Sequence, residues 1–231
     1  MDIHDSIAAN LTAIRARIGA AALAAGRRAD DVRLVAVSKT FSADHVRAAY
    51  AEGQRDFGEN KVQEALQKIG ETADIPIRWH LIGHLQSNKA KKVARFDAIH
   101  SIDSASLLQK VDDAAAAAGR QPELLVQVDL AAEPTKFGAP EASLAEIFAA
   151  ARSMSAARVV GLMLLPPAVD DPDAARPYFR ALRDVRDRLS TAGVPDAMLA
   201  ELSMGMSHDF EVAVEEGATI VRVGTAIFGG R

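Results

Sequence analysis

The chain has 231 residues, of which 49% are hydrophobic and 25% charged, and its formal net charge is −4. This balance is typical of a globular protein with a large core, and it argues against disorder, nucleic-acid binding and an anionic membrane surface. Cysteine is absent, which excludes disulfides, thiol catalysis and cysteine-ligated metal centres. No apolar run reaches the length of a membrane span and residues 1–5 lack a signal-peptide pattern, so we expect a cytoplasmic protein without a membrane partner.

The first predicted element is a helix over residues 6–25, which ends before Gly26. Its apolar residues recur at helical spacing and form one stripe along the helix. They are Ile7, Leu11, Ile14, Ile18 and Leu23. The stripe predicts that this helix packs on the rest of the protein.

From residue 33 onward, short apolar segments alternate with amphipathic ones. The apolar segments predict β-strands over residues 33–38, 56–58, 78–82, 98–102, 124–130, 159–165, 197–203 and 219–223. The segments between them predict helices over residues 42–52, 60–69, 87–93, 104–118, 140–154, 172–192 and 207–216.

Strands that alternate with helices indicate parallel βαβ units, and eight of them in a chain of this length favour a (β/α)8 TIM barrel. We therefore expect one domain over residues 1–231, an α/β barrel preceded by an extra N-terminal helix. A doubly wound open sheet is the alternative. It is less favoured because the sequence has no dinucleotide-binding fingerprint and no visible break in strand order.

Two loops carry the clearest functional pattern. In a TIM barrel the active site lies at the carboxyl ends of the strands, and a phosphate often binds at the loops after strands seven and eight. Here Ser203 ends the seventh predicted strand and Gly205 follows it, and Gly224 and Thr225 follow the eighth. Hydroxyl groups and glycines suit a phosphate site, although the same residues also occur as turns and helix caps.

Lys39 and Arg222 are the other candidates. Lys39 directly follows the first strand, where an amine in a partly enclosed mouth could react with an aldehyde, or could simply be a solvated lysine. Arg222 lies within the eighth strand and needs a partner there. That partner is either a buried carboxylate, Glu201 or Asp129, or an acceptor on the ring of a ligand. An amine, a phosphate site and a ring partner together are what pyridoxal 5′-phosphate requires.

Seven segments carry a resemblance to a known family. They are residues 34–39 (LVAVSK), 57–64 (FGENKVQE), 79–89 (WHLIGHLQSNK), 135–138 (TKFG), 161–167 (GLMLLPP), 202–207 (LSMGMS) and 221–229 (VRVGTAIFG). On these segments the sequence resembles the YggS/PROSC-type pyridoxal phosphate homeostasis proteins, whose fold is similar to the barrel domain of alanine racemase. The matching segments run through nearly the whole chain.

The resemblance implies roles for individual residues. Lys39 would hold pyridoxal 5′-phosphate as a Schiff base, and Arg222 would face the pyridine nitrogen. Asn60 would line the cofactor site, and Lys136 would be a secondary lysine with a role in cofactor transfer. No metal is implied.

The resemblance further implies that Ser203, Gly224 and Thr225 hold the phosphate. The family's function is that of a carrier, which limits the free aldehyde and supplies the cofactor to apo-enzymes through transient contacts. We therefore expect a protein without strong catalytic activity. We also expect a monomer, because the barrel has no obvious swapped element.

A pyridoxal phosphate-dependent amino-acid racemase is the alternative function. An arginine at the ring nitrogen weakens the electron sink of the cofactor but does not exclude racemisation. A two-base racemase needs a second acid–base group opposite the lysine. Tyr50 and Tyr178 lie on predicted outer helices, and His80, His84 and His208 are more typical of hydrogen-bonding positions.

Two further alternatives remain. In one, Lys39 acts on the aldehyde of another phosphorylated ligand. In the other, the basic run at residues 89–92 binds nucleic acid. That run is short, lacks interleaved aromatic residues and lies in an acidic protein, so a solvated helix face is the better interpretation.

Overall fold

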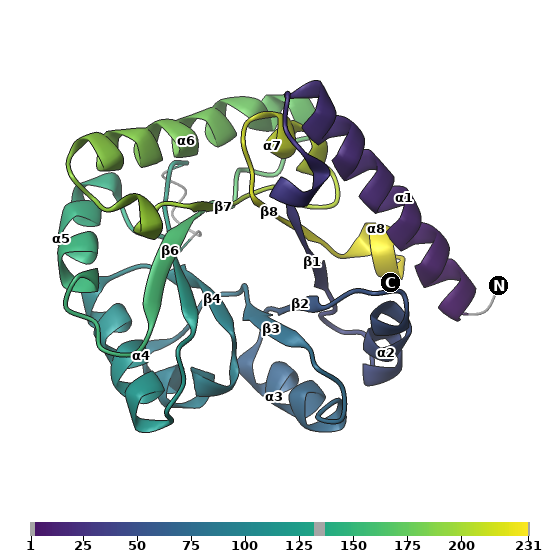
Figure 1. Cartoon of the computed structure of the whole chain (residues 1–231), viewed down its shortest axis with the longest axis horizontal. Helices are drawn as coiled ribbons and strands as arrows, with labels where there is room; N and C mark the ends of the chain where they lie inside the picture. The colour runs from purple at the N-terminus through teal and green to yellow at the C-terminus, as the bar shows by residue number, and fades with distance from the viewer. Residues whose placement is uncertain (1–2, 132–136, 231) are drawn as a thin grey trace.

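The protein is a closed barrel of eight parallel strands surrounded by helices, as seen in a computed structural model that describes residues 3–131 and 137–230 (Figure 1). The strands follow the order of the chain around the barrel. They are β1 Arg33–Val37, β2 Asp56–Glu59, β3 Arg78–Leu81, β4 Ala98–Ile102, β5 Glu123–Gln127, β6 Arg158–Met163, β7 Glu201–Ser203 and β8 Ile220–Val223. The expected (β/α)8 barrel is confirmed, and the open sheet is excluded because β8 pairs with β1, with Arg33 opposite Ile220.

Helices connect the strands on the outside of the barrel. The α-helices are α1 Ile3–Ala24, α2 Ala43–Ala51, α3 Val62–Glu71, α4 Ala105–Ala117, α5 Glu141–Ala151, α6 Arg176–Thr191, α7 Phe210–Glu215 and α8 Thr225–Phe228. Four 3₁₀ segments complete the connections: η1 Ala29–Asp31, η2 Ser87–Arg95, η3 Pro172–Ala175 and η4 Asp196–Met198. The expected helix over residues 87–93 is thus a 3₁₀ segment.

Two strands differ in extent from the prediction. β5 stops at Gln127, whose carbonyl accepts from the Ala139 N–H. Val128 still donates to the Met163 carbonyl of β6, but it also bridges to Ala139. β7 is short because Pro195 precedes a 3₁₀ turn over the residues expected to begin the strand. The change in β5 lengthens a loop at the carboxyl end of the barrel, where ligand sites of this fold lie, whereas the change in β7 is at the amino end.

The barrel interior is divided between apolar and polar side chains. A small apolar cluster consists of Val35, Leu125, Met163 and Ile220. A much larger apolar cluster lies between the strands and the helices. Polar strand residues are buried as well: His80, His100, Ser203 and Arg222 form hydrogen bonds with one another inside the barrel, whereas Glu59 faces α3. A buried polar interior requires hydrogen-bond partners, and these partners organise the site.

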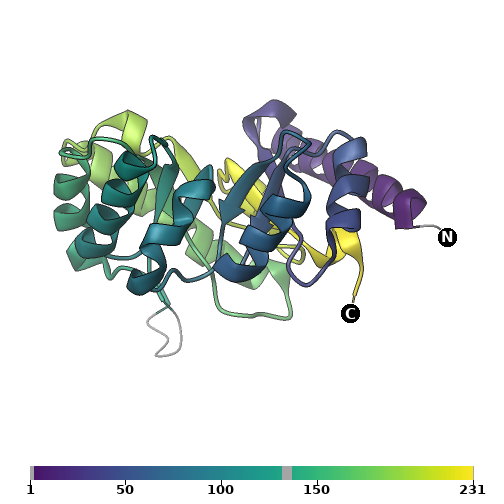
Figure 2. The same ribbon diagram turned by 90° about the horizontal axis from the view of Figure 1, so that it is seen from below.

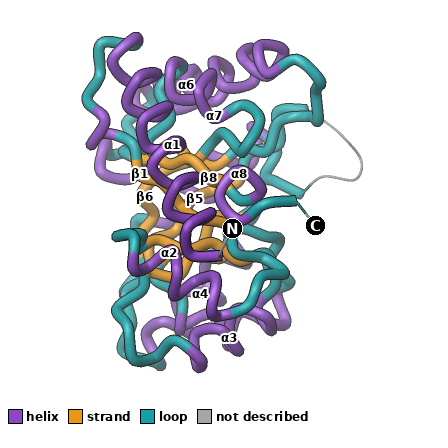
Figure 3. The backbone as a smooth tube through the Cα atoms, turned by 90° about the vertical axis from the view of Figure 1, so that its right-hand side faces the viewer, coloured by secondary structure: helices purple, strands orange, loops and turns teal. Residues whose placement is uncertain are grey.

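Helix α1 covers the junction between the first and last strands. It contacts α2, α7 and α8, and Figure 3 shows it crossing in front of β1 and β8. The Asn10 side chain donates to the Ile227 carbonyl at 2.8 Å, and Arg17 forms two hydrogen bonds with Glu211. As Figure 2 shows, α1 and the last residues of the chain lie on the same side of the molecule.

By length and composition alone, α1 also meets the criteria for a membrane span, the one helix in the described ranges that does. Core helices satisfy the same criteria. Four residues of the predicted apolar stripe face the protein and are buried, namely Ile7, Leu11, Ile14 and Ile18. The prediction was wrong for Leu23, which lies in the last turn of α1 and is 76% exposed. This packing accounts for the apolar composition of the helix.

Candidate functional site

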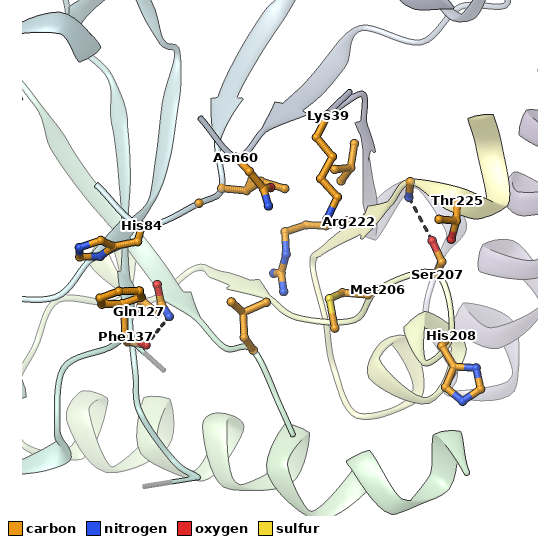
Figure 4. A pocket seen from close by; sticks show the side chains of 15 residues that line it. Lys39, Asn60, His84, Gln127, Phe137, Met206, Ser207, His208, Arg222 and Thr225 are labelled. Atoms are coloured by element: carbon orange, nitrogen blue, oxygen red, sulfur yellow. Dashed lines mark hydrogen bonds between the residues drawn. The ribbon is translucent and has the colours of Figure 1, made fainter. Parts of the chain in front are cut away.

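A cavity of about 520 Å³ opens at the carboxyl ends of the strands (Figure 4). Volumes of this size are typical of sites for small molecules. Five of the residues predicted from the sequence line it together, although they come from distant parts of the chain. They are Lys39, Asn60, Arg222, Gly224 and Thr225.

Lys39 and Arg222 enter this cavity from neighbouring strands. β1 and β8 pair with Val35 opposite Arg222, and Lys39 follows the end of β1. Figure 4 shows the two side chains extending into the same space. The cavity therefore combines a half-buried amine with a guanidinium group on adjacent parts of one wall.

Arg222 is 3% exposed and is held by neutral acceptors. Its Nη1 donates to Ser203 Oγ at 2.6 Å, and its Nη2 donates to the Leu164 carbonyl at 2.9 Å. Burial lowers the pKa of Arg222 to about 10, so the group still carries its charge at neutral pH. Glu201, one of the two carboxylates considered as its partner, instead binds Thr219 and Arg33.

The backbone around Lys39 is constrained on both sides. Thr40 adopts a φ of 70°, a region that residues with a Cβ rarely occupy. Its N–H donates to Glu64 Oε1 at 2.5 Å, while the Ser38 carbonyl accepts from Lys68 Nζ at 2.7 Å. Lys68 and Glu64 also form an ion pair at 2.9 Å. The two side chains of α3 thus hold the peptide groups before and after Lys39.

Glu59, at the end of β2, joins these contacts of Glu64 and Lys68 around Lys39. Its Oε1 accepts from Lys68 Nζ and from Ser38 Oγ, each at 2.7 Å. Its Oε2 is buried and has no hydrogen-bond partner among the described residues. Burial raises the pKa of Glu59, and the hydrogen bonds from Lys68 and Ser38 offset this only in part. The ionised form of Glu59 therefore depends on Lys68.

The loops after β7 and β8 form another wall of the cavity. Ser207 and Thr225 line it, and Ser207 Oγ accepts from the Gly224 N–H at 3.1 Å. Gly205 has a φ of 91°, and a Cβ there would lie 2.6 Å from the Ala213 Cβ, so only glycine fits this turn. Two hydroxyl groups and a tight backbone turn are thus available to an anion.

Ser203 does not reach the cavity wall. It is fully buried as the last residue of β7, where its hydroxyl binds Arg222 and His100. Ser207, in the loop that follows, takes the place expected for Ser203. Both serines belong to the same sequence motif. The position of Ser207 after Gly205, in the loop, could have indicated that Ser207 lines the cavity.

The opposite wall is formed after β2, β3 and β5. Asn60 lies close to Gly83, where a Cβ would be 2.2 Å from the Asn60 carbonyl oxygen. His84 stacks on Phe137 with ring centroids 3.6 Å apart, and Gln127 donates to the Phe137 carbonyl. Sequence reasoning missed Gln127, the last residue of β5, and Phe137, because the strand was predicted to continue to residue 130. The predicted secondary lysine, Lys136, lies outside the described residues.

The candidate second bases are distributed differently. Tyr50 lies on α2 beneath the Arg55 guanidinium, and Tyr178 lies on α6, so neither lines the cavity. His84 and His208 do line it, and His208 Nε2 lies 2.9 Å from the Asp170 carbonyl oxygen. His80 is buried within the barrel. The described residues contain no cluster of histidine and carboxylate side chains suited to a metal ion.

The chain is similar in sequence to known proteins over nearly its whole length. Residues 5–231 match the family model described as "Alanine racemase, N-terminal domain". The "Pyridoxal phosphate homeostasis protein" of Aquifex aeolicus is 40% identical over 222 residues, which cover 96% of this chain and 96% of that protein.

Solved structures show the same similarity. PipY of Synechococcus elongatus is 40% identical, and its structure without PLP matches with a TM-score of 0.87 over 96% of this chain and 100% of PipY. A second PipY structure, with PLP bound, matches with a TM-score of 0.85 over the same shares of the two chains. An alanine racemase from Clostridium difficile is 16% identical with a TM-score of 0.75 over 98% of this chain and 57% of that one, a likeness of fold alone.

Proposed function

The chain belongs to the family of pyridoxal phosphate homeostasis proteins, which share the alanine racemase N-terminal domain, and we propose that its cavity binds pyridoxal 5′-phosphate. One observation carries this proposal: Lys39, Arg222 and the hydroxyl groups of Ser207 and Thr225 line a single cavity of suitable volume. These are the groups that an aldehyde, a ring nitrogen and a phosphate require.

Each residue has a role in the proposed complex. Lys39 would hold the cofactor through its amine, which lines the cavity and would react with the aldehyde. Arg222 donates toward the pyridine nitrogen. Ser207, Gly224 and Thr225 hold the phosphate, and Asn60 lines the site. When bound, the cofactor supplies an electrophilic aldehyde and an electron-withdrawing ring.

We propose that the protein is a carrier rather than a catalyst. The relatives named above are homeostasis proteins, and a guanidinium that donates to the ring nitrogen leaves that nitrogen unprotonated, which weakens the electron sink. The protein would bind the reactive aldehyde, keep its free concentration low, and supply it to apo-enzymes through transient contacts. Residues 1–231 would act as one domain, as a monomer in the cytoplasm, with Lys136 as a secondary lysine in transfer.

The first experiment is an absorbance spectrum of purified protein with added cofactor, comparing wild type with Lys39→Ala. We expect a Schiff-base band in wild type and its loss in Lys39→Ala, because no other described lysine lines the cavity. Lys61→Ala, which removes an exposed lysine near the site, is the matched control and should keep the band.

Borohydride reduction followed by peptide mapping assigns the attachment site. Reduction on a different lysine would contradict the role of Lys39, and the absence of a band in wild type with excess cofactor would contradict cofactor binding. Rapid racemisation of alanine by the loaded protein would contradict the carrier role and favour the racemase.

A further inference from the structure

A chain of hydrogen bonds runs through the barrel interior to Arg222. Asp56 Oδ1 lies 2.8 Å from His80 Nε2, and His80 Nδ1 lies 3.0 Å from His100 Nε2. His100 Nδ1 lies 2.9 Å from Ser203 Oγ, which lies 2.6 Å from Arg222 Nη1. We call Asp56, His80, His100 and Ser203 the interior chain.

The interior chain crosses the barrel and follows its axis. His100 and Ser203 belong to β4 and β7, which are separated around the barrel by β5 and β6, so their hydrogen bond spans the interior. Asp56 is the first residue of β2, whereas Arg222 lies near the carboxyl end of β8. The chain thus connects the end of the barrel opposite the cavity with the cavity wall.

Donor chemistry gives every hydrogen bond of the interior chain the same direction. An arginine only donates, so Ser203 Oγ accepts from Arg222. The Ser203 hydroxyl proton then has His100 Nδ1 as its acceptor among the described contacts. His100 must therefore carry its proton on Nε2 and donate to His80 Nδ1, and His80 donates from Nε2 to the Asp56 carboxylate. Both imidazoles are neutral in this arrangement.

The surrounding charges favour these protonation states. Burial, together with the charges of Arg222 and Arg33, lowers the pKa of His100 well below its usual value. Burial alone would raise the pKa of Asp56, but the hydrogen bond from His80 and the charges of Arg78 and Arg33 hold it below its usual value. The carboxylate of Glu123 lies on the other side of Arg33 and Arg78. Asp56 is thus an ionised acceptor next to cationic groups.

We propose that the interior chain positions the guanidinium of Arg222 for its contact with the ring of the bound cofactor. Arg222 makes no ion pair with a carboxylate within the described ranges, so its orientation depends on two neutral acceptors, the Leu164 carbonyl and the Ser203 hydroxyl. The obligate acceptor Asp56 fixes the direction of each bond and therefore keeps the Ser203 oxygen available to Arg222. This inference rests on the proposed function, and it adds four positioning residues to it.

The test compares two ligands, pyridoxal 5′-phosphate and pyridoxal, which share the ring and aldehyde but differ in the phosphate. Asp56→Asn is the key variant. The asparagine amide has the same shape as the carboxylate but can donate as well as accept, so the hydrogen bonds of the interior chain lose their fixed direction. We expect it to weaken binding of both ligands by the same factor, about fivefold. Glu123→Gln removes a charge at the same end of the barrel and should leave both affinities unchanged.

A spectroscopic readout separates positioning from a general structural effect. In ¹⁵N NMR spectra of the ligand-free protein, we expect His80 and His100 to be protonated on Nε2 only. Addition of pyridoxal should shift the ring nitrogens of His100, and Asp56→Asn should reduce this shift. Glu123→Gln should retain it.

The outcomes are distinct. If wild type binds neither ligand, the proposed function fails and the positioning role fails with it. If wild type binds both ligands and Asp56→Asn binds them equally well, only the positioning role is overturned. It is also overturned if Asp56→Asn weakens the phosphorylated ligand alone, or if His100 is protonated on Nδ1.

Discussion

Ser203 and Ser207 share one motif but lie in different surroundings. Ser203 is fully buried and binds Arg222, whereas Ser207 lines the cavity and accepts from the Gly224 N–H. The two hydroxyls should therefore affect different parts of a bound cofactor. This difference distinguishes a phosphate contact from a ring contact.

We predict that Ser207→Ala weakens the binding of pyridoxal 5′-phosphate about tenfold, the effect of losing one hydrogen bond to a charged group. The affinity for pyridoxal should not change, since pyridoxal lacks the phosphate. Thr225→Ala should behave in the same way. Fluorescence titration with both ligands measures this, and an equal loss for both ligands would contradict a phosphate contact.

The residue types at the site could be predicted from the sequence, but the positions of their side chains could be predicted only in part. Lys39 and Arg222 are unusual next to apolar strands, and the structure places both in one cavity. The phosphate prediction on Ser203 was less exact, because whether a serine at a strand end faces the interior or the loop depends on where the strand stops. His100 had no local signal, since its partner Ser203 is distant in the sequence.

At the scale of elements, α3 braces the segment that carries Lys39. Lys68 is almost completely buried and binds Glu59, Glu64 and the Ser38 carbonyl. The spacing of Glu64 and Lys68 on a predicted helix is that of an ion pair, so this part was visible in the sequence. The contact with Glu59 was not, because it depends on how α3 packs against β2.

We predict that Lys68→Met destabilises the protein by about 3–5 kcal/mol, because Glu59 would remain buried without its cation. The folded-state pKa of Glu59 is already raised, so between its unfolded and folded values the native state binds more protons and stability falls as pH rises. In Lys68→Met this pKa rises further, and the loss should therefore be larger at neutral than at mildly acidic pH. Urea denaturation at two pH values measures it.

The double variant Lys68→Met with Glu59→Gln is the control for this prediction. A neutral amide removes the uncompensated charge, so the double variant should recover much of the lost stability and its dependence on pH. A loss that is the same at both pH values and is not recovered by Glu59→Gln would show that Lys68 contributes through packing alone.

The type and order of the elements followed from local patterns, whereas some boundaries did not. Alternating apolar and amphipathic segments predicted all eight strands, and the structure contains them in the expected order. The end of β5 coincides with the pairing of Val128 with Ala139, a contact that leaves no periodic pattern in the sequence. The start of β7 is set by the 3₁₀ turn that follows Pro195, which interrupts the apolar segment expected to be a strand.

At the scale of the whole molecule, α1 holds the two ends of the barrel together. It packs on α2 near the start of the barrel and on α7 and α8 near its end. The contact is apolar in its centre, with Leu11 fully buried, and polar at its edges, with Arg17 bound to Glu211. None of the α1 residues lines the cavity.

We predict that Leu11→Ala lowers the free energy of unfolding by about 2–5 kcal/mol, the usual range for a buried leucine. Leu23, on the same helix, is 76% exposed, so Leu23→Ala is a matched control that should change stability by less than about 0.5 kcal/mol. Chemical denaturation compares the two. Cofactor affinity of folded Leu11→Ala should equal that of wild type, and a large loss of affinity would mean that α1 affects the site.

The closure of the barrel also has a consequence for biosynthesis. β1 pairs with β8, and α1 packs on α7 and α8, so α1 and β1 depend on partners between residues 210 and 228, which are synthesised later. Until those residues emerge, one edge of β1 stays unpaired and the apolar stripe of α1 stays uncovered. Contacts that span so much of the chain slow folding and expose aggregation-prone surface in the nascent chain. The barrel therefore completes its folding only after residues 210–228 have been synthesised.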